Sequence, residues 1–272
     1  MTDHAQMTEL AAHRGNVVRS EVNKDADYDL EQWMQAKLLL QEADSVLDLG
    51  CGNGKQCRAF STFVGPKGHV TGVDIFSSVE GLRDAADRYL EGLANVSLLD
   101  HDASKPFAMA DASFDAITSA YSIYYLSDLE AVLVELKRLL KPSGKLFVVG
   151  PAWDNSREFY DLHIRISGQQ LSSNFTGHLL RINDEVLPLA FRIFDHVEIS
   201  PFVNRVFFRG EVGLQRLLDY YRNSMLAAEA SQSDEQTSAL VARLEQDVKP
   251  VFEQDGQYIM FKRALGITCY KK

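Results

Sequence analysis

Three glycines at alternate positions are the first sign of chemistry in this sequence. They end a short apolar run and are Gly50, Gly52 and Gly54. Asp48 lies two residues ahead of the first of them. A glycine turn between a strand and a helix lets a ligand approach the backbone closely. A dinucleotide turn has the spacing G-x-G-x-x-G, and Lys55 occupies the place of its third glycine. The spacing therefore disfavours a nicotinamide-dependent oxidoreductase.

Acidic residues lie at the ends of successive predicted strands, at Asp48, Asp74 and Asp102. In an open parallel sheet, ligands bind beyond the carboxyl ends of the strands, so these acids form a line of groups suited to one extended ligand. A carboxylate at position 48 suits an ammonium group, and the carboxylate of Asp74 suits the two hydroxyls of a ribose. An amino acid, a ribose and a base in one molecule describe S-adenosylmethionine.

The elements that position these residues alternate between apolar strands and amphipathic helices. The predicted strands are 45–50, 69–76, 95–102, 113–120 and 145–151, and the predicted helices are 28–43, 55–64, 77–93 and 128–142. This alternation predicts parallel strands with right-handed crossovers, and therefore an α/β fold with a doubly wound sheet.

Beyond Pro151 the alternation is lost. The later predicted elements are a strand at 196–210, helices at 211–229 and 234–247, and a closing hairpin-like pair at 258–272. Four segments follow from this pattern: an N-terminal helical cap (1–43), a cofactor-binding core (44–150), a substrate-side insertion (151–195), and strands and helices that complete the same domain (196–272).

Five stretches resemble, in order, the motifs of class I S-adenosylmethionine-dependent methyltransferases. They are VLDLGCGNG, VTGVDIF, LLDHDASKPF, SFDAITSAYSIYYLSD and ELKRLLKPSGKLFVV. The resemblance covers residues 44–150 and implies a Rossmann-like seven-stranded sheet that is mostly parallel, with an antiparallel last strand and helices on both faces. Residues 196–272 would supply strands six and seven. The resemblance also implies a methyltransferase enzyme with S-adenosylmethionine as its cofactor.

In that family the first motif surrounds the methionyl part of the cofactor. By resemblance, the residues that would shape this pocket are Asp48, Gly50, Cys51, Gly52 and Gly54.

The later motifs of the family contact the rest of the cofactor. By the same resemblance, Asp74 would hold the ribose hydroxyls and Ile75 would pack on the adenine. Asp102 would meet the adenine amino group, with Ala103 lending a backbone amide. Ser119 would offer its backbone carbonyl to the methionyl ammonium.

The sequence indicates less about the residues that bind the methyl acceptor. Methyl transfer depends on alignment and exclusion of water, and it needs a base only when the nucleophile must lose a proton. We expect Tyr121, which follows the fourth strand, to line the methyl-transfer site. His163 and His178 are the candidate bases of the insertion. For each of the three, a packing or surface role is the alternative. The insertion also carries arginines that would suit an anionic acceptor, namely Arg157, Arg165 and Arg181.

Composition limits the partners. The formal net charge is −10, from 38 acidic and 28 basic side chains, which disfavours nucleic acid and anionic membranes. The fourth strand is followed by SAYS, not by the N-P-P-Y signature of amide and adenine methylation, and no Pro-Cys pair offers the nucleophile of cytosine methylation. We therefore expect a small-molecule acceptor with an O, N or C nucleophile, and neither nucleic acid nor membrane as partner.

Three cysteines without a C-x-x-C pair and an N-terminus without an apolar run predict a cytoplasmic protein. No cluster with metal-ligand spacing is found, so no metal is predicted. The oligomeric state is left open between a monomer and a homodimer. Two alternative functions also stay open, a catalytically silent S-adenosylmethionine-binding scaffold and a protein or peptide methyltransferase.

Overall fold

The computed structural model describes residues 25–272, except for the side chain of Asn174. Residues 1–24 of the predicted N-terminal cap lie outside the described residues. The strands are β1 (Ser45–Leu49), β2 (His69–Asp74), β3 (Val96–Asp100), β4 (Phe114–Ala120), β5 (Leu140–Pro151), β6 (His196–Arg209) and β7 (Gln257–Tyr270). The longer helices are α2 (Leu30–Leu38), α3 (Lys55–Val64), α4 (Leu82–Tyr89), α5 (Leu129–Leu139), α6 (Arg157–Ser167), α7 (Ser173–Arg181), α8 (Leu187–Ile193), α9 (Gly210–Arg222), α10 (Met225–Ala230) and α11 (Asp234–Asp255).

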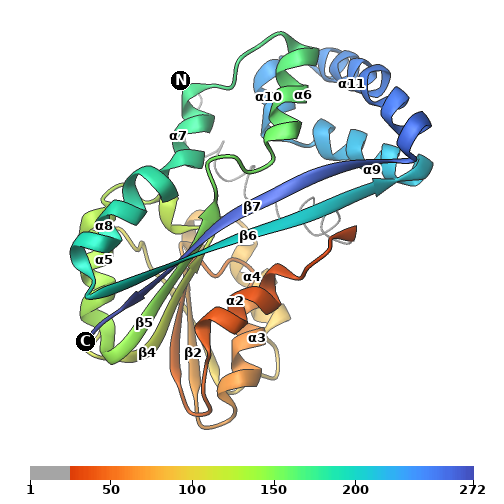
Figure 1. Ribbon diagram of the computed structural model, residues 1–272. Helices are drawn as coiled ribbons and strands as arrows, with labels where there is room; N and C mark the ends of the chain where they lie inside the picture. Colours follow the sequence, from red (N-terminus) through yellow and green to blue (C-terminus); the bar gives the residue numbers. More distant parts are fainter. Residues whose placement is uncertain (1–24) are drawn as a thin grey trace. The chain divides into compact units, whose positions relative to one another are not determined.

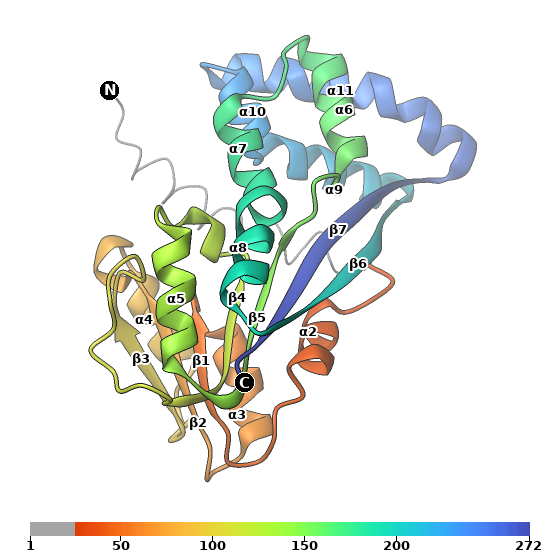
Figure 2. The same ribbon diagram turned by 60° about the vertical axis from the view of Figure 1, so that its left-hand side comes forward.

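Within the described residues, seven strands form one sheet in the order β3-β2-β1-β4-β5-β7-β6. The pairs β1–β2, β1–β4, β2–β3 and β4–β5 are parallel, and β5–β7 is antiparallel. The strand order reverses between β1 and β4, which is where an open α/β sheet binds its ligand. The predicted fold class is confirmed, and the long strands β7 and β6 lie side by side, with β6 at the edge of the sheet (Figures 1 and 2).

Helices cover both faces of the parallel part of the sheet, as the nearly continuous burial of β1 requires. Val46 packs in one cluster with residues of α2 and α3, whereas Leu47 packs in the opposite cluster with residues of α5 and α8. Figure 1 shows α2 and α3 on one side of the strands and α5 and α8 on the other. The strands are therefore buried on both faces, and polar side chains inside them are exceptions that require an explanation.

Three local predictions were wrong, and one of them is the helix 211–229, which the structure divides into α9 and α10. Residues 258–272 do not form a hairpin-like pair, because β7 runs without a turn from Gln257 to Tyr270. Gly266 in the middle of that strand serves close packing, since a Cβ there would lie 2.7 Å from the Trp33 ring. The predicted helix 77–93 is shorter. A 3-10 turn, η2 (Phe76–Ser78), precedes α4, and Gly81 with φ +73° begins the helix.

The chain divides into two compact units, and the division does not follow the four predicted segments. The sheet unit comprises Asp29–Trp153, Gly177–Phe202 and Ala264–Lys272. The helical unit comprises Asp154–Thr176 and Val203–Arg263, together with the described residues 25–28. The predicted insertion 151–195 is thus shared between the two units.

The helical unit has its own hydrophobic core, built from α6, α9, α10, α11 and the outer parts of β6 and β7. Phe159, Tyr221 and Met260 are buried members of that core. Ion pairs tie its elements together, with Arg165 2.5 Å from Asp247. These contacts allow the helical unit to be described as a separate packing unit.

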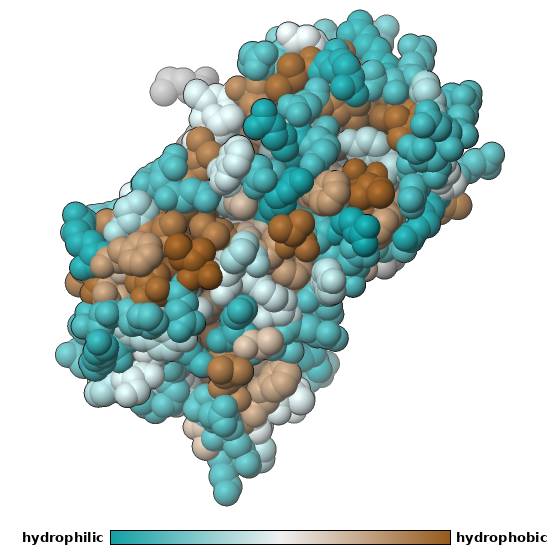
Figure 3. Space-filling view, viewed as in Figure 1, coloured by the Kyte–Doolittle hydropathy of each residue, from teal (hydrophilic) through white to brown (hydrophobic). Residues whose placement is uncertain are grey.

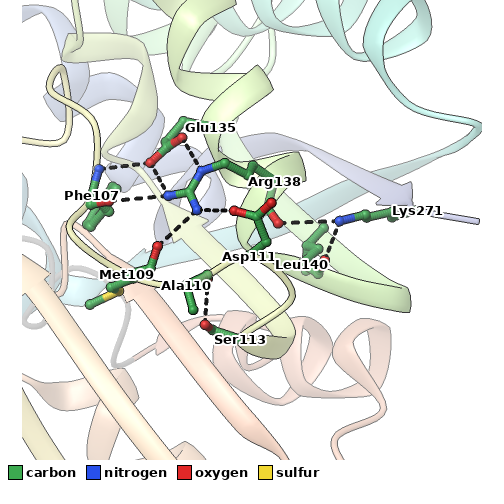
Figure 4. A network of polar contacts seen from close by, with 9 residues as sticks. All are labelled: Phe107, Met109, Ala110, Asp111, Ser113, Glu135, Arg138, Leu140 and Lys271. Atoms are coloured by element: carbon green, nitrogen blue, oxygen red, sulfur yellow. Dashed lines mark hydrogen bonds and ion pairs between the residues drawn. The ribbon is translucent and has the colours of Figure 1, made fainter.

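At the amino end of β4, Arg138 on α5 fixes the loop that leads into the strand (Figure 4). Its guanidinium donates to the carboxylates of Glu135 and Asp111 and to the backbone carbonyls of Phe107 and Met109. These charged partners raise the pKa of the arginine further. The loop between β3 and β4 is therefore held by a saturated polar network.

An apolar patch lies over α5 and α8 on the face shown in Figure 3. On these two helices the side chains of Val134 and Phe191 are unusually exposed for their type, at 53% and 55%. Such patches are typical of interaction surfaces, and the homodimer stays a prediction. Among residues 25–272, no helix combines the length and the apolar character that a membrane crossing requires.

Candidate functional site

The glycine turn is tied to the end of the neighbouring strand. The amides of Gly50 and Cys51 both donate to the carbonyl of Val73, at 2.8 and 3.0 Å. The amide of Gly52 donates to Asp74 Oδ2 at 2.8 Å. Two predicted site elements, the turn after β1 and the acid at the end of β2, are thus held together by direct hydrogen bonds.

The glycines of the turn differ in what surrounds them, although all have positive φ. A Cβ on Gly50 would lie 2.2 Å from the Cβ of Ser122, and one on Gly54 would lie 2.6 Å from Leu90 Cδ1. No heavy atom lies within 4 Å of the Cβ position of Gly52. Gly50 and Gly54 therefore serve close packing, whereas Gly52 borders open space where a ligand can approach the backbone.

Asp74 is oriented by backbone amides on both of its carboxylate oxygens. Asp74 Oδ1 accepts from the amide of Ile75 at 2.8 Å, and Oδ2 accepts from the turn. Each oxygen keeps a second lone pair, so the carboxylate can still accept from two hydroxyl groups. Ile75 is 42% exposed beside it. This arrangement fits a ribose and an adjacent planar base.

The structure gives Asp102, the third acidic position, no contact that marks it as a ligand for the adenine. The Asp102 carboxylate accepts from the amide of Ser104 at 3.0 Å, and this hydrogen bond lowers the pKa of Asp102. Ala103 is buried at 9% exposure. Asp100, which the sequence reading did not single out, is the register partner of Asp74 and accepts from the amide of Ser77. Asp102 and Ala103 remain predictions, with Asp100 as a further candidate at that edge.

Asp48 is enclosed in the sheet, at 1% exposure. Among the described residues its one hydrogen-bond partner is the thiol of Cys57, with Sγ 3.4 Å from Oδ2. Burial raises the pKa of Asp48 to about 7. A carboxyl group with so few donors is costly to ionise, and a cation would favour its charged form. The predicted role toward an ammonium group stays a prediction.

The loop after β4 is connected to β1 by a pair of serines. Ser119 is fully buried, and its Oγ lies 2.6 Å from Ser122 Oγ, which donates to the carbonyl of Leu49 at 2.7 Å. Ser122 was not predicted from the sequence, although the two serines of SAYS are spaced closely enough to bond to each other. Tyr121 between them has φ +55°, a strained conformation for a large side chain that is typical of functional sites.

The insertion reaches the same loop through Arg181, at the end of α7. Its Nη1 donates to the carbonyls of Tyr124 and Leu126 at 2.6 and 2.7 Å, and its Nε and Nη2 donate to Glu185. Four of its five N–H donors are thereby used, which disfavours the anion-binding role that the sequence suggested for Arg181. It fixes the 3-10 turn η3 (Ile123–Tyr125) instead.

The two candidate histidines lie in different units. The His178 ring packs on Tyr125 with centroids 5.4 Å apart, and its Nδ1 has no hydrogen-bond partner among the described residues. His163 is 3% exposed inside the helical unit, with Nδ1 2.8 Å from the Tyr221 hydroxyl. Burial lowers the pKa of His163. This surrounding favours a packing role for His163 and leaves His178 as the candidate base.

The site that emerges lies at the carboxyl ends of β1, β2 and β4 in the sheet unit. It offers an open backbone turn, an oriented carboxylate and an exposed apolar side chain in a row. No group of three His, Cys, Asp or Glu side chains in the described part of the chain could hold a metal ion. The fold and this row of groups define the class of Rossmann-like proteins that bind a nucleoside with an amino-acid tail.

Comparison with known proteins agrees with that class. The family described as a methyltransferase domain matches residues 40–188, and the chain belongs to this family. A ubiquinone/menaquinone biosynthesis C-methyltransferase, UbiE, from Burkholderia cenocepacia is 35% identical over 121 residues, which are 43% of this chain and 48% of the relative. The chain therefore spans about half the length of the curated relatives that it matches.

Solved structures share the fold at low sequence identity. A putative methyltransferase from Bacillus halodurans has a TM-score of 0.57 and 18% identity, over 89% of this chain and 98% of that one. A phosphoethanolamine N-methyltransferase from Haemonchus contortus, solved with S-adenosylhomocysteine, has a TM-score of 0.55 and 17% identity, over 90% of this chain and 54% of that one. The prediction of a class I S-adenosylmethionine-dependent methyltransferase is confirmed.

Proposed function

We propose that this protein methylates a nucleophilic oxygen, nitrogen or carbon of a small-molecule acceptor that binds beside the loop after β4. His178 carries the proposal, because its Nδ1 is buried without a partner among the described residues while its ring packs on Tyr125. An unpaired polar atom at this depth is costly unless a ligand uses it. The cofactor, when bound, supplies an electrophilic methyl group on a positively charged sulfur.

The residues that would hold the cofactor are those whose surroundings fit its parts. Gly52 offers backbone beside open space, Asp74 keeps acceptor capacity for the ribose, and Ile75 offers an apolar surface for the base. Asp48 and Ser119 would face the methionyl ammonium. The other predicted contacts are Gly50, Cys51, Gly54, Asp102 and Ala103.

The acceptor side of the sheet unit is aromatic, and of the three arginines that the sequence suggested only Arg181 belongs to this unit. Tyr125 is 47% exposed, and its ring lies 4.6 Å from that of Tyr124. Arg181 is bound to carbonyls and Glu185, and Arg165 in the helical unit is bound to Asp247. An uncharged, planar acceptor therefore fits better than a phosphorylated one.

The residues of this chain have two roles in the proposed reaction, which are to align the acceptor and to remove a proton from it. Tyr121 and Tyr125 would align the acceptor and exclude water, which supplies most of the rate in methyl transfer. The imidazole of His178 would accept the proton that an O–H or N–H nucleophile loses. His163 and Tyr221 would then keep the helical unit packed.

The experiment measures S-adenosylhomocysteine formation with a panel of small phenols, amines and aromatic carbon nucleophiles. We expect His178→Gln to lower turnover about 100-fold, the usual contribution of a general base, while binding of S-adenosylhomocysteine stays unchanged. His69→Gln is the matched control, because His69 is an exposed histidine on β2 that contacts Ser97. Binding without turnover on any acceptor or peptide would favour the silent scaffold, and turnover on peptides alone would favour a protein methyltransferase.

A further inference from the structure

Asp48 belongs to a row of residues that crosses four strands of the sheet. The register pairs Gly72 on β2 with Asp48, Asp48 with Thr118 on β4, and Thr118 with Phe147 on β5. Register partners in adjacent parallel strands point to the same face. The lateral neighbours of the Asp48 carboxyl group are therefore a glycine on one side and the Thr118 side chain on the other.

The cluster memberships of neighbouring pairs confirm which face this is. Val46 and its partner Ala116 both belong to the cluster that α3 covers, while Leu47 and its partner Ile117 both belong to the opposite one. Asp48 and Thr118 come next along the strands, so both point toward α3. Thr118 is 1% exposed.

The side of Asp48 next to Gly72 is occupied by sulfur. A Cβ on Gly72 would lie 2.8 Å from Cys57 Sγ and 2.9 Å from Cys51 Sγ. Cys57 is the donor to Asp48 on this side, and its hydrogen bond to Cys51 together with burial raises the pKa of the Cys57 thiol. Asp74 is the other titratable group that acts on Asp48. None of these groups carries a positive charge.

On the other side, Thr118 Oγ1 is buried and has no hydrogen-bond partner among the described residues. A buried hydroxyl without a partner costs free energy. The lateral neighbour of Thr118 on β1 is the Asp48 carboxyl group, whose donor among the described residues is the Cys57 thiol. We propose that Thr118 is a positioning residue for Asp48, and that its hydroxyl donates to the carboxylate when Asp48 ionises on binding the cofactor's ammonium group. This inference rests on the proposed role of Asp48.

The charge balance of this step is simple. Below about pH 7 the Asp48 carboxyl group of the free protein holds a proton, and on binding it loses this proton to solvent while the ammonium group supplies the compensating charge. Thr118 keeps its own proton and shares it in the new hydrogen bond. Because burial raises the pKa of Asp48 to about 7, binding at pH 6.0 should release about 0.9 proton, whereas binding at pH 8.5 should release almost none.

The test is calorimetric titration with S-adenosylhomocysteine, which carries the same ammonium group, in two buffers of different ionisation enthalpy at each pH. We expect Thr118→Val to lower the affinity about 10-fold at pH 6.0, where binding requires Asp48 to ionise, and to move the midpoint of proton release to higher pH. Thr118→Ser should restore both. The matched control is Thr71→Val, since Thr71 is buried on β2 but its register partner is Leu47, on the opposite face.

The outcomes separate the claims. Unchanged affinity and unchanged proton release in Thr118→Val, or an equal loss in Thr71→Val, would overturn the role of Thr118. Unchanged binding and proton release in Asp48→Asn would overturn the role of Asp48 and the inference with it. Failure of the wild-type protein to bind S-adenosylhomocysteine would instead overturn the proposed function. If Thr118→Val does not fold, Thr118→Ala and Thr118→Ser are compared in the same way, and equal binding by the two contradicts the inference.

Discussion

The two ends of the strands in the sheet unit differ in how far their buried polar groups are hydrogen-bonded. At the amino end of β4, the Arg138 guanidinium is saturated by carboxylates and loop carbonyls (Figure 4). Toward the carboxyl end, polar atoms are buried without partners among the described residues, namely Thr118 Oγ1 and His178 Nδ1. Asn183 Nδ2, on the π-turn η4 (Ile182–Val186) that follows α7, is a third.

This difference separates structure from function within one sheet. A saturated network stabilises the fold and has nothing left for a ligand, whereas unpaired buried atoms cost stability and are tolerated where a ligand will satisfy them. We therefore expect substitutions at the amino end to change stability alone. Substitutions at the carboxyl end should change ligand binding, and some should increase stability.

The largest expected effect is on the pH dependence of stability at Asp48. Its pKa rises from 3.8 to about 7 on folding, so the folded state binds the proton more tightly and stability falls as the pH rises from about 4 to about 7. Replacement by Asn removes this loss, which amounts to about 4 kcal/mol across that range.

Urea unfolding at pH 4.5 and pH 8.0 measures the effect. Tryptophan fluorescence reports it selectively, because both tryptophans, Trp33 and Trp153, belong to the sheet unit. Asp48→Asn should gain stability relative to the wild type at pH 8.0, and the exposed Asp84→Asn should not. Parallel pH profiles for the wild type and Asp48→Asn would contradict the prediction.

The second effect is a loss of stability at Arg138. Arg138→Met removes five hydrogen bonds and leaves Glu135 without its cation, so we expect a loss of about 3 kcal/mol in the free energy of unfolding. Binding of S-adenosylhomocysteine to the folded variant should stay unchanged. Arg83→Met, which breaks an exposed pair with Asp87, is the control and should change stability little. A large loss of cofactor affinity in Arg138→Met would break the contrast between the two ends.

The third effect sharpens the contrast within the turn itself. Gly50→Ala places a Cβ against Ser122 in a left-handed conformation and should cost about 2 kcal/mol of stability. Gly52→Ala meets no atom within 4 Å, so it should cost only about 1 kcal/mol from its positive φ. The added methyl group of Gly52→Ala should nevertheless weaken S-adenosylhomocysteine binding, as measured by calorimetry. Equal stability losses in the two variants would refute the distinction.

The cofactor side of the site could be predicted from sequence because its signal is local. The spacing of the glycines and the acids at strand ends depends only on short stretches of chain, and Gly52 and Asp74 are hydrogen-bonded to each other in the structure. The fold class followed from the same alternation of strands and helices. The single strand β7 could not be predicted in this way, because Gly266 indicates a turn unless its packing against Trp33 is known.

The acceptor side could not be predicted, because it depends on contacts between distant segments. Arg181 lies 57 positions from Tyr124, whose carbonyl it binds, and nothing in the sequence near Arg181 indicates that partner. A role for the Thr118 hydroxyl can be inferred only from the register that places Thr118 beside Asp48. His163 and His178 look alike in sequence, and only the fold places one in a core and the other on an aromatic turn.

The central claim is that the carboxyl end of this sheet binds S-adenosylmethionine through Asp74 and the turn beside it. Calorimetric titration of Asp74→Ala with S-adenosylhomocysteine tests it most directly, with Asp87→Ala as a control on the exposed face of α4. We expect Asp74→Ala to lose affinity by roughly 10- to 100-fold, since charged hydrogen bonds to the ribose are removed, and Asp87→Ala to bind as the wild type does. Equal affinities in the wild type and Asp74→Ala would contradict the account.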